Sequence, residues 1–215
     1  MVDLFKRCGT ATAKTETNEK LGNFYGSKNA AAARSAYDAE NLANGYKVST
    51  NGCAMIARHV YPYDGSIHDA ACGTGIVAGL LELVGFQNIA GSDLSPEMFK
   101  FAEKISAYQR FYEHDLGHHL PEKDNSFAAV TFFGSLGLGH VPAKCMDEFV
   151  RITRSGGHII FNIRAETYPE QELKQAVDAF SETGAWKMVD QSLIFRSYDF
   201  IEPDVTSKAH AFKVL

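Results

Sequence analysis

The sequence predicts an α/β protein with a doubly wound, mostly parallel sheet. Short apolar segments alternate with segments of helical periodicity between residues 66 and 184, as expected for parallel strands joined by right-handed helical crossovers. A turn containing two glycines, "CGTG", follows the first apolar segment. The last two strand-like segments, 186–201 and 209–215, have no helix between them. We therefore expect seven strands, with an antiparallel strand near one edge of the sheet.

The first half of the alternation contains three strands and two helices. Residues 66–72 ("SIHDAAC") form a short apolar run, whereas 75–86 ("GIVAGLLELVGF") has helical spacing. The segment 88–94 ("NIAGSDL") is again a short apolar strand. The segment 95–105 ("SPEMFKFAEKI") begins with a serine that can cap a helix and a proline suited to its first turn. Residues 110–116 ("RFYEHDL") are predicted as the third strand.

The second half repeats this pattern. Residues 127–136 ("FAAVTFFGSL") are continuously apolar, which is typical of a strand buried on both faces. The segment 143–153 ("AKCMDEFVRIT") has helical spacing, and 155–164 ("SGGHIIFNIR") combines a glycine turn with another buried strand. Residues 170–184 ("EQELKQAVDAFSETG") are predicted as a helix that Gly184 terminates.

The N-terminal part differs in composition from this domain. Residues 1–23 are polar and are predicted to form a flexible tail. Residues 24–62 contain an alanine-rich run that favours helix, and Gly45 can break it. We therefore predict an N-terminal helical cap at 24–62 and a single globular unit at 63–215.

The composition argues against charged macromolecular partners. The 215 residues carry 21 Lys and Arg against 26 Asp and Glu, and the basic residues are scattered. Nucleic acid is recognised by a basic stripe, so neither nucleic acid nor a membrane surface is an expected partner. No segment approaches the roughly 20 apolar residues of a spanning helix. A signal peptide is not expected either.

Cysteine and histidine spacing predicts neither a disulfide framework nor a metal site. The four cysteines are far apart and form no CxxC pair. Three histidines are close together, but the glycine between them favours a loop over a metal-binding helix. We expect a cytoplasmic monomer or homodimer that binds a small molecule. The residues concerned are Cys8, Cys53, Cys72, Cys145, His114, His118 and His119.

Candidate ligand-binding residues fall at the carboxyl ends of four predicted strands. Asp69 and the turn 73–75 follow the first strand, Asp93 the second, Asp115 the third, and Gly134 closes the fourth. Ligands of open α/β sheets bind at this edge, near the topological switch point. We therefore expect these residues to surround one site.

Two kinds of ligand fit the glycine turn. Residues 73–78 match the dinucleotide fingerprint G-x-G-x-x-G/A, and Asp93 follows at the distance of a ribose-binding acid. This pattern predicts a nicotinamide-dependent oxidoreductase. However, no lysine follows the turn, and Asp69 would repel a pyrophosphate while attracting an ammonium or sulfonium group.

From Ile67 to Ile163, the motifs resemble those of class I S-adenosylmethionine-dependent methyltransferases, in the same order. "DAACGTG" resembles the family's D-x-G-C-G-T-G, "GSDLSPEMFKFA" its ribose segment, "HDLGHHLPEKDNSFAAV" its adenine segment, and "RITRSGG" its R-x-x-K-P-G-G turn. "DAACGTGIVAGLLELVGF", "GSDLSPEM" and "GSLGLGHVP" resemble most the methyltransferase-like proteins of the Williams-Beuren region. The resemblance implies the Rossmann-like methyltransferase fold, with S-adenosyl-L-methionine as cofactor.

The resemblance also implies residue roles. Asp93 would accept both ribose hydroxyls, Asp69 would complement the positive charge of the methionine moiety, Asp115 would accept from the adenine amino group, and the Leu116 amide would face the ring nitrogen. The implied cofactor-binding residues are Asp69, Ala70, Cys72, Gly73, Gly75, Asp93, Leu94, Met98, Asp115, Leu116 and Gly134.

Structural interpretations remain open for several of these residues. Asp93 could instead cap the helix from 95, Asp115 could be an exposed loop acid, and Met98 could be plain core. Cys72 is predicted as buried packing rather than a nucleophile.

The sequence departs from the family's motifs at four positions. Ala71 stands where the family has its first glycine, and its methyl group is tolerated if its φ is negative. Ala128 replaces an aspartate, which should affect packing rather than the cofactor. Arg154 and Ser155 replace the lysine and proline of the later turn.

The acceptor side is less defined. In-line methyl transfer needs alignment and exclusion of water, and needs a base only when the acceptor loses a proton. The candidate catalytic residues are His140 as a base and Tyr37 as a residue that closes over the cofactor. A solvated histidine and ordinary aromatic packing are the alternatives. Further candidates for the acceptor pocket are Tyr25, Tyr46, Ser135, Asn162 and Arg164.

The sequence therefore predicts an S-adenosylmethionine-dependent methyltransferase acting on a small-molecule acceptor. A nicotinamide-dependent oxidoreductase and a non-catalytic S-adenosylmethionine-binding partner protein are the alternatives.

Overall fold

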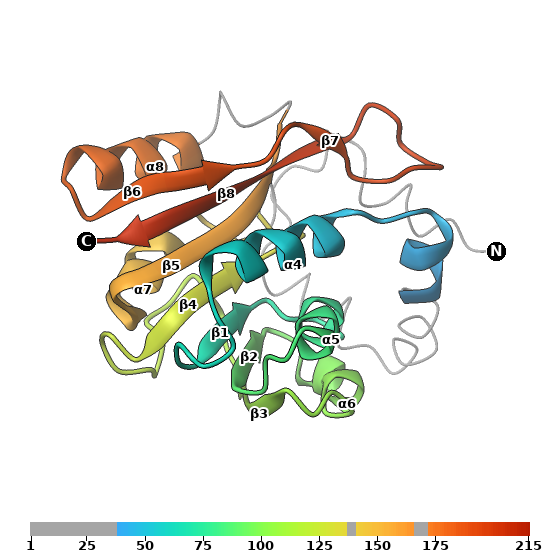
Figure 1. The fold of residues 1–215 in the computed structure, drawn as a ribbon, viewed down its shortest axis with the longest axis horizontal. Coiled ribbons are helices and arrows are strands. Elements are labelled where there is room, and N and C mark those ends of the chain that lie inside the picture. Colours follow the sequence, from blue (N-terminus) through green and yellow to red (C-terminus); the bar gives the residue numbers. More distant parts are fainter. Residues whose placement is uncertain (1–37, 137–140, 166–171) are drawn as a thin grey trace.

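The computed structural model describes residues 38–136, 141–165 and 172–215, and its described part contains one mixed sheet (Figure 1). The strands are β1 (Ile67–Ala70), β2 (Ile89–Asp93), β3 (Tyr108–Glu113), β4 (Phe127–Phe132), β5 (Thr153–Arg164), β6 (Trp186–Gln191), β7 (Phe195–Arg196) and β8 (Thr206–Val214). The helices are α4 (Val48–His59), α5 (Ile76–Leu83), the 3₁₀ turn η1 (Pro96–Met98), α6 (Phe99–Ala102), α7 (Cys145–Ile152) and α8 (Glu172–Glu182). Residues 38–43 are also helical.

The strand order is β3-β2-β1-β4-β5-β8-β6, with β7 paired to β8. Strands β1 to β5 are parallel, whereas β8 runs antiparallel to β5, β6 and β7. The chain builds outward from β1 to β3 and then returns to place β4 on the other side of β1, so the switch point lies between β1 and β4. The doubly wound prediction is confirmed, and so is the antiparallel strand near one edge. That strand is β8, which lies one position inside the edge strand β6.

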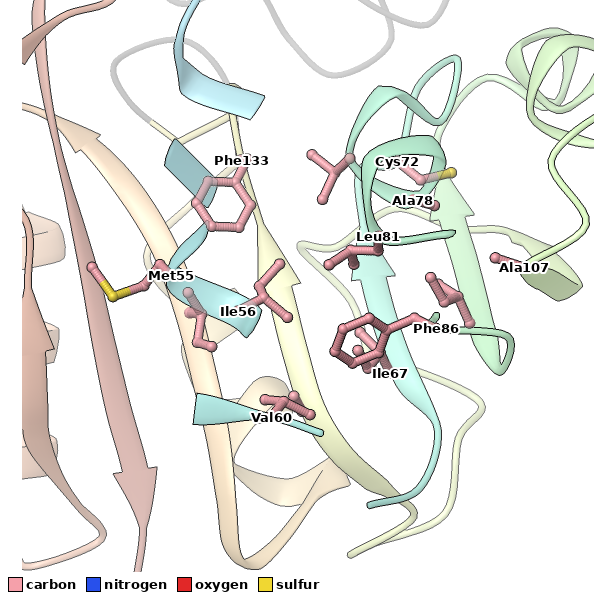
Figure 2. Close-up of a cluster of buried hydrophobic side chains, with 14 of the residues drawn as sticks. Met55, Ile56, Val60, Ile67, Cys72, Ala78, Leu81, Phe86, Ala107 and Phe133 are labelled. Carbon is pink, nitrogen blue, oxygen red and sulfur yellow. The ribbon is translucent and has the colours of Figure 1, made fainter. Parts of the chain in front are cut away.

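Helices cover both faces of the sheet. On one face, α4 packs against β5, β8 and α5, and Figure 2 shows Met55 and Ile56 of α4 in one cluster with Leu81 of α5 and Ile67 of β1. On the other face, side chains of α7 and α8 pack against β4, β5, β6 and β8 around Trp186. Because successive strand residues point to opposite faces, these continuously apolar strands supply both layers. Helix α4, which belongs to the predicted cap, is thus part of the main core.

Three predicted elements have different boundaries in the structure. The expected helix at 95–105 is reduced to η1 and the four residues of α6. The expected third strand at 110–116 is β3 at Tyr108–Glu113, and the expected strand at 186–201 is divided into β6 and β7. β3 is an edge strand whose side chains are mostly exposed or half-buried, so its sequence lacks the continuous apolar signal that identified β4.

Candidate active site

A pocket opens at the carboxyl ends of β1, β2 and β4, at the switch point of the sheet. Six of the predicted cofactor-binding residues border it: Asp69, Cys72, Gly73, Asp93, Met98 and Gly134. The other residues of its wall are Tyr46, Ser49, Ala71, Thr74, Ile76, Val77, Phe133 and Ser135. Parallel strands bring these loops together because their carboxyl ends meet at the same edge.

The turn after β1 has an unusual backbone. Gly73 and Gly75 have φ values of 55° and 88°, in the left-handed region that favours glycine. A Cβ on Gly73 would meet no atom within 4 Å, so this glycine faces open space that a side chain would begin to fill. A Cβ on Gly75 would lie 2.6 Å from Cδ1 of Ile105. Gly73 thus opens the pocket, whereas Gly75 permits close packing beneath the turn.

Ala71 shares this left-handed conformation. Its φ is 52°, so the condition under which its methyl group would be tolerated without strain is not met. The turn keeps the conformation that glycine would adopt, and the alanine methyl group makes it strained by about 1–2 kcal/mol.

Asp93 connects β2 to the turn. Its Oδ2 accepts a hydrogen bond from the Gly73 N–H and its Oδ1 accepts one from the Ser95 N–H, both at 2.9 Å. Asp93 therefore closes the turn that leads into η1, whereas the Ser95 hydroxyl makes no capping hydrogen bond within the described residues. A carboxylate has about four acceptor positions, so these two bonds are compatible with binding a ligand's hydroxyl groups.

Asp69 borders the pocket and is 2% exposed. Its Oδ2 accepts a 2.6 Å hydrogen bond from the Tyr108 hydroxyl, and its Oδ1 accepts one of 3.1 Å from Thr131 Oγ1. Burial raises the pKa of Asp69 to about 6; the hydrogen bonds from Tyr108 and Thr131 oppose the rise, and the charge of Asp93 adds to it. Asp69 is therefore mainly ionised at neutral pH.

Residues before α4 also contact the turn. Thr74 Oγ1 donates a 2.7 Å hydrogen bond to Oδ1 of Asp38, and burial raises the pKa of Asp38. The Tyr46 hydroxyl lies close to Gly134. A Cβ on this glycine would be only 2.7 Å from the hydroxyl oxygen. The Gly134 N–H donates to Asn162 Oδ1 at 2.8 Å. Sequence reasoning did not find the Asp38–Thr74 contact, since no motif relates two residues so far apart in the chain.

Several predicted residues lie outside the described wall of this pocket: Ala70, Gly75, Leu94, Asp115, Leu116, Asn162 and Arg164. The Ala70 methyl group and the Leu116 side chain belong to the core cluster on the opposite face of the sheet. Asp115 Oδ1 accepts a 2.8 Å hydrogen bond from the Gly117 N–H, which shapes its own loop. Tyr25, Tyr37 and His140 lie outside the described residues.

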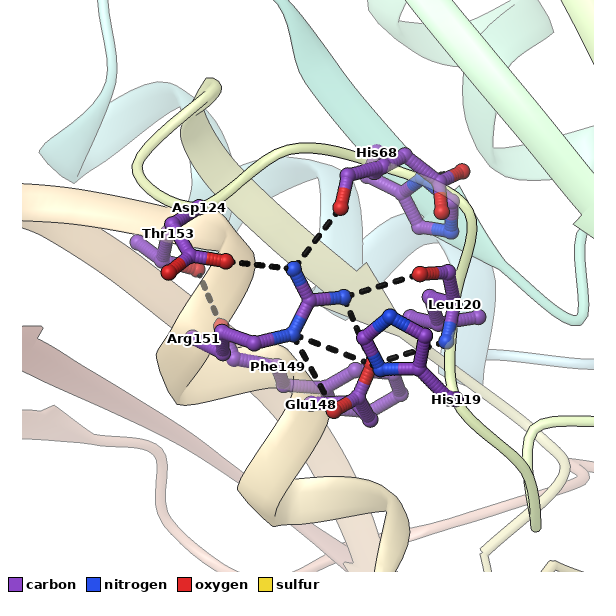
Figure 3. A network of polar contacts seen from close by, with 9 residues as sticks. His68, His119, Leu120, Asp124, Glu148, Phe149, Arg151 and Thr153 are labelled. Atoms are coloured by element: carbon purple, nitrogen blue, oxygen red, sulfur yellow. Dashed lines mark hydrogen bonds and ion pairs between the residues drawn. The ribbon is translucent and has the colours of Figure 1, made fainter.

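A network on α7 fixes the loop that follows Asp115 (Figure 3). Arg151 donates hydrogen bonds to the carbonyls of Leu120 and Glu122, at 2.9 and 2.7 Å. It also pairs with Glu148 at 2.6 Å and with Asp124 at 2.7 Å. The hydrogen bond from Arg151 lowers the pKa of Glu148 to about 2. This network anchors the segment that the sequence resemblance associates with adenine.

A second buried cluster on the other face of the sheet has no access to the pocket. His68 Nε2 lies 2.9 Å from Ser92 Oγ, and His68 Nδ1 lies 3.4 Å from Glu122 Oε1. Both His68 and Ser92 are 0% exposed, and burial lowers the pKa of His68 to about 3. A serine that no substrate can reach is no nucleophile, so this arrangement is structural. The described residues contain no group of three or more ligands suited to a metal ion, and no helix among them is long and apolar enough to span a membrane.

Comparison with known proteins finds similarity to methyltransferases. Residues 68–161 match the protein family described as "Methyltransferase domain". The match runs from β1 into β5 and so includes the strands whose carboxyl ends form the pocket.

Two similar curated proteins carry methyltransferase names. Methyltransferase-like protein 27 of Homo sapiens is 33% identical over 130 residues, which cover 59% of this chain and 53% of that protein. A demethylmenaquinone methyltransferase of Clavibacter sepedonicus is 30% identical over 160 residues, which cover 72% of this chain and 64% of that protein. The chain thus spans between about half and two thirds of the length of these two relatives.

Solved structures show the same fold at low sequence identity. Magnesium protoporphyrin IX methyltransferase from Synechocystis PCC 6803, crystallised with bound S-adenosylmethionine, has a TM-score of 0.65 and 13% identity. The alignment covers 94% of this chain and 99% of that chain. The same enzyme has also been crystallised with bound S-adenosylhomocysteine.

Proposed function

We propose that this protein is an S-adenosylmethionine-dependent methyltransferase that acts on a small-molecule acceptor. The main support is the position of Asp93. Its carboxylate accepts a hydrogen bond from the Gly73 N–H, and both residues border the pocket, where no atom lies within 4 Å of a Cβ placed on Gly73. A carboxylate at the end of β2 suits a ribose diol, because its oxygens can each accept another hydrogen bond. The open backbone at Gly73 suits the methionine moiety.

Two carboxylates favour this cofactor over a nicotinamide dinucleotide. Asp69 borders the pocket, and Asp38 is hydrogen-bonded to the turn through Thr74. Both would repel a pyrophosphate at the turn, whereas both would attract an ammonium or sulfonium group. The electrostatics of the site thus weigh against the oxidoreductase interpretation of the G-x-G-x-x-A match.

The chain's residues would act mainly by positioning. The bound cofactor supplies a methyl group activated by a sulfonium. Asp93, the Gly73 backbone and Asp69 hold the cofactor, while Phe133 and Tyr46 provide apolar walls that exclude water. In the proposal, Asp115 and Leu116 contact the adenine and Met98 packs beside it, as the sequence resemblance implies.

The acceptor is proposed to be a small molecule. The absence of a basic stripe in the sequence supports this choice, as do the small-molecule substrates in the names of the menaquinone and protoporphyrin enzymes. His140 and Tyr37 remain the candidate base and closing residue. The free thiols of Cys53, Cys72 and Cys145 support the proposal of a cytoplasmic location.

Calorimetric titration tests this function. The wild type is expected to bind S-adenosylmethionine and S-adenosylhomocysteine with micromolar affinity and to bind NADH poorly. Asp93→Ala should weaken cofactor binding about tenfold or more, because it removes charge-assisted hydrogen bonds. Asp147→Ala, an exposed acid on α7, is the matched control and should bind like the wild type. Binding of NADH alone would support the oxidoreductase instead. Cofactor binding without methyl transfer to any of a panel of acceptors would support the non-catalytic alternative.

A further inference from the structure

Tyr108, the first residue of β3, reaches across a neighbouring strand to the pocket. Its hydroxyl donates the 2.6 Å hydrogen bond to Asp69 on β1, although β2 lies between β3 and β1. The residue is 8% exposed, and its ring lies against Phe111 with 4.7 Å between centroids. A buried tyrosine hydroxyl normally finds a hydrogen-bond partner, and here the partner is a carboxylate that borders the candidate cofactor pocket.

Two glycines make this reach possible. Gly91 on β2 is in register with Asp69, and a Cβ on Gly91 would lie 3.0 Å from Cε1 of Tyr108 and 2.9 Å from Sγ of Cys72. Gly75 lies in the turn, and a Cβ there would be 3.0 Å from Cε2 of Tyr108. A side chain at either position would occupy space that the tyrosine ring fills. The ring therefore supports the glycine turn and Asp69 at the same time.

Thr131 completes the surroundings of Asp69 from the opposite side. It lies on β4 in register with Asp69 and donates the 3.1 Å hydrogen bond to the second carboxylate oxygen. Both oxygens thus accept a hydrogen bond from a neutral hydroxyl in a buried position. Neutral donors stabilise the ionised carboxylate without cancelling its charge, so this charge remains available to a cation in the pocket.

We propose that Tyr108 is a positioning residue of the cofactor site, which holds Asp69 as an ionised carboxylate for the α-ammonium group of the methionine moiety. This role rests on the proposed function. Thr131 assists from β4, and the absence of side chains at Gly75 and Gly91 admits the tyrosine.

The protonation of Asp69 provides a specific readout. Its pKa is raised to about 6, so protonation removes the charge as the pH falls through that value. Loss of a donor would raise this pKa further, because the hydrogen bond from Tyr108 favours the ionised form. Removing the Tyr108 hydroxyl should therefore weaken cofactor binding more at low pH than at high pH. Loss of a packing contact alone would weaken binding equally at every pH.

Other titratable groups around Asp69 do not produce this signal. Burial raises the pKa values of Cys72 and Tyr108 well above their usual ranges, so both stay neutral between pH 5 and 8. Asp93 of β2 raises the pKa of Asp69 by its charge, Asp38 is bonded to Thr74 of the turn, and Tyr46 also borders the pocket. A comparison of variant and wild type at each pH cancels the titration of these shared groups.

The first measurement is the pKa of Asp69 in the ligand-free protein, by ¹³C NMR of side-chain carboxyl groups. Asp69→Asn identifies the signal. Tyr108→Phe keeps the ring and should raise the midpoint by about one unit, a tenfold change in the protonation equilibrium. Tyr112→Phe, on the same strand, should leave the midpoint unchanged. An unchanged Asp69 midpoint in Tyr108→Phe would overturn the proposal. If Tyr108→Phe does not fold, Thr131→Val removes the other hydroxyl donor to Asp69 and should also raise the midpoint.

The second measurement is the affinity for S-adenosylhomocysteine across this pH range. The ratio of Kd values, Tyr108→Phe over wild type, should be close to one at pH 8 and rise to about five- to tenfold at pH 5.5. A ratio that is the same at every pH would assign Tyr108 to packing alone. A wild type that does not bind the ligand at any pH would refute the proposed function, and with it this role, independently of the NMR result.

Discussion

Ala71→Gly is expected to stabilise the protein, although it removes a methyl group from the pocket wall. Ala71 has a φ of 52°, a conformation that costs an L-residue about 1–2 kcal/mol. Glycine avoids this cost but loses about 0.5–1 kcal/mol more backbone entropy on folding. At the middle of these two ranges, the expected net gain in the free energy of unfolding is about 0.7 kcal/mol. For a chain of this size, that gain corresponds to a rise in Tm of about 1–4 °C.

Urea unfolding, followed through the fluorescence of the single tryptophan, Trp186, measures this gain. Trp186 is 1% exposed in the native state, so its emission should change strongly on unfolding. The matched control is Ala57→Gly in α4, where the same atoms are removed from an exposed helical position. That variant should lose about 0.5–1 kcal/mol. If both variants lose stability, the backbone of the turn is not left-handed at Ala71 and the reasoning is refuted.

Two further predictions concern packing and charge around the site. Gly91→Ala should lower the free energy of unfolding by about 1–3 kcal/mol, because the new Cβ would lie 3.0 Å from the Tyr108 ring in a packed interior. An unchanged Tm would show that the Tyr108 ring can shift without cost, which would contradict this prediction. Arg151→Gln should lower the stability at pH 7 by about 1–3 kcal/mol, because it removes hydrogen bonds to the loop carbonyls and to Glu148. The pKa of Glu148 is lowered from 4.5 to about 2. The stabilisation that comes from the Arg151–Glu148 ion pair is therefore fully present above about pH 4.5 and declines as the pH falls toward 2. Unfolding curves between pH 3 and 7 should show the gap between wild type and Arg151→Gln narrowing only below pH 4.5, and a gap that does not vary with pH would contradict this account.

The doubly wound architecture and the location of the pocket could be predicted from local patterns. Apolar runs such as "FAAVTFF" identify buried parallel strands, and the alternation with helices requires a doubly wound sheet. Once the strands are parallel, geometry alone brings Asp69, Gly73 and Asp93 to one edge. These three residues do border a common pocket.

Other features depend on register across several strands and could not be predicted. The Tyr108–Asp69 hydrogen bond requires β3, β2 and β1 in a particular alignment, with Gly91 between them. The Thr74–Asp38 contact depends on how the segment before α4 packs. The helix after Asp93 is short because the chain turns at 103–104 and brings Ile105 under Gly75, a contact that helical periodicity alone does not reveal.

The most direct test of the central claim is a crystal structure of the protein with S-adenosylhomocysteine. The account predicts both ribose hydroxyls within about 3 Å of the Asp93 carboxylate, with the amino acid moiety beside Gly73 and its ammonium group facing Asp69. A ligand bound elsewhere, or one whose ribose makes no contact with Asp93, would contradict it.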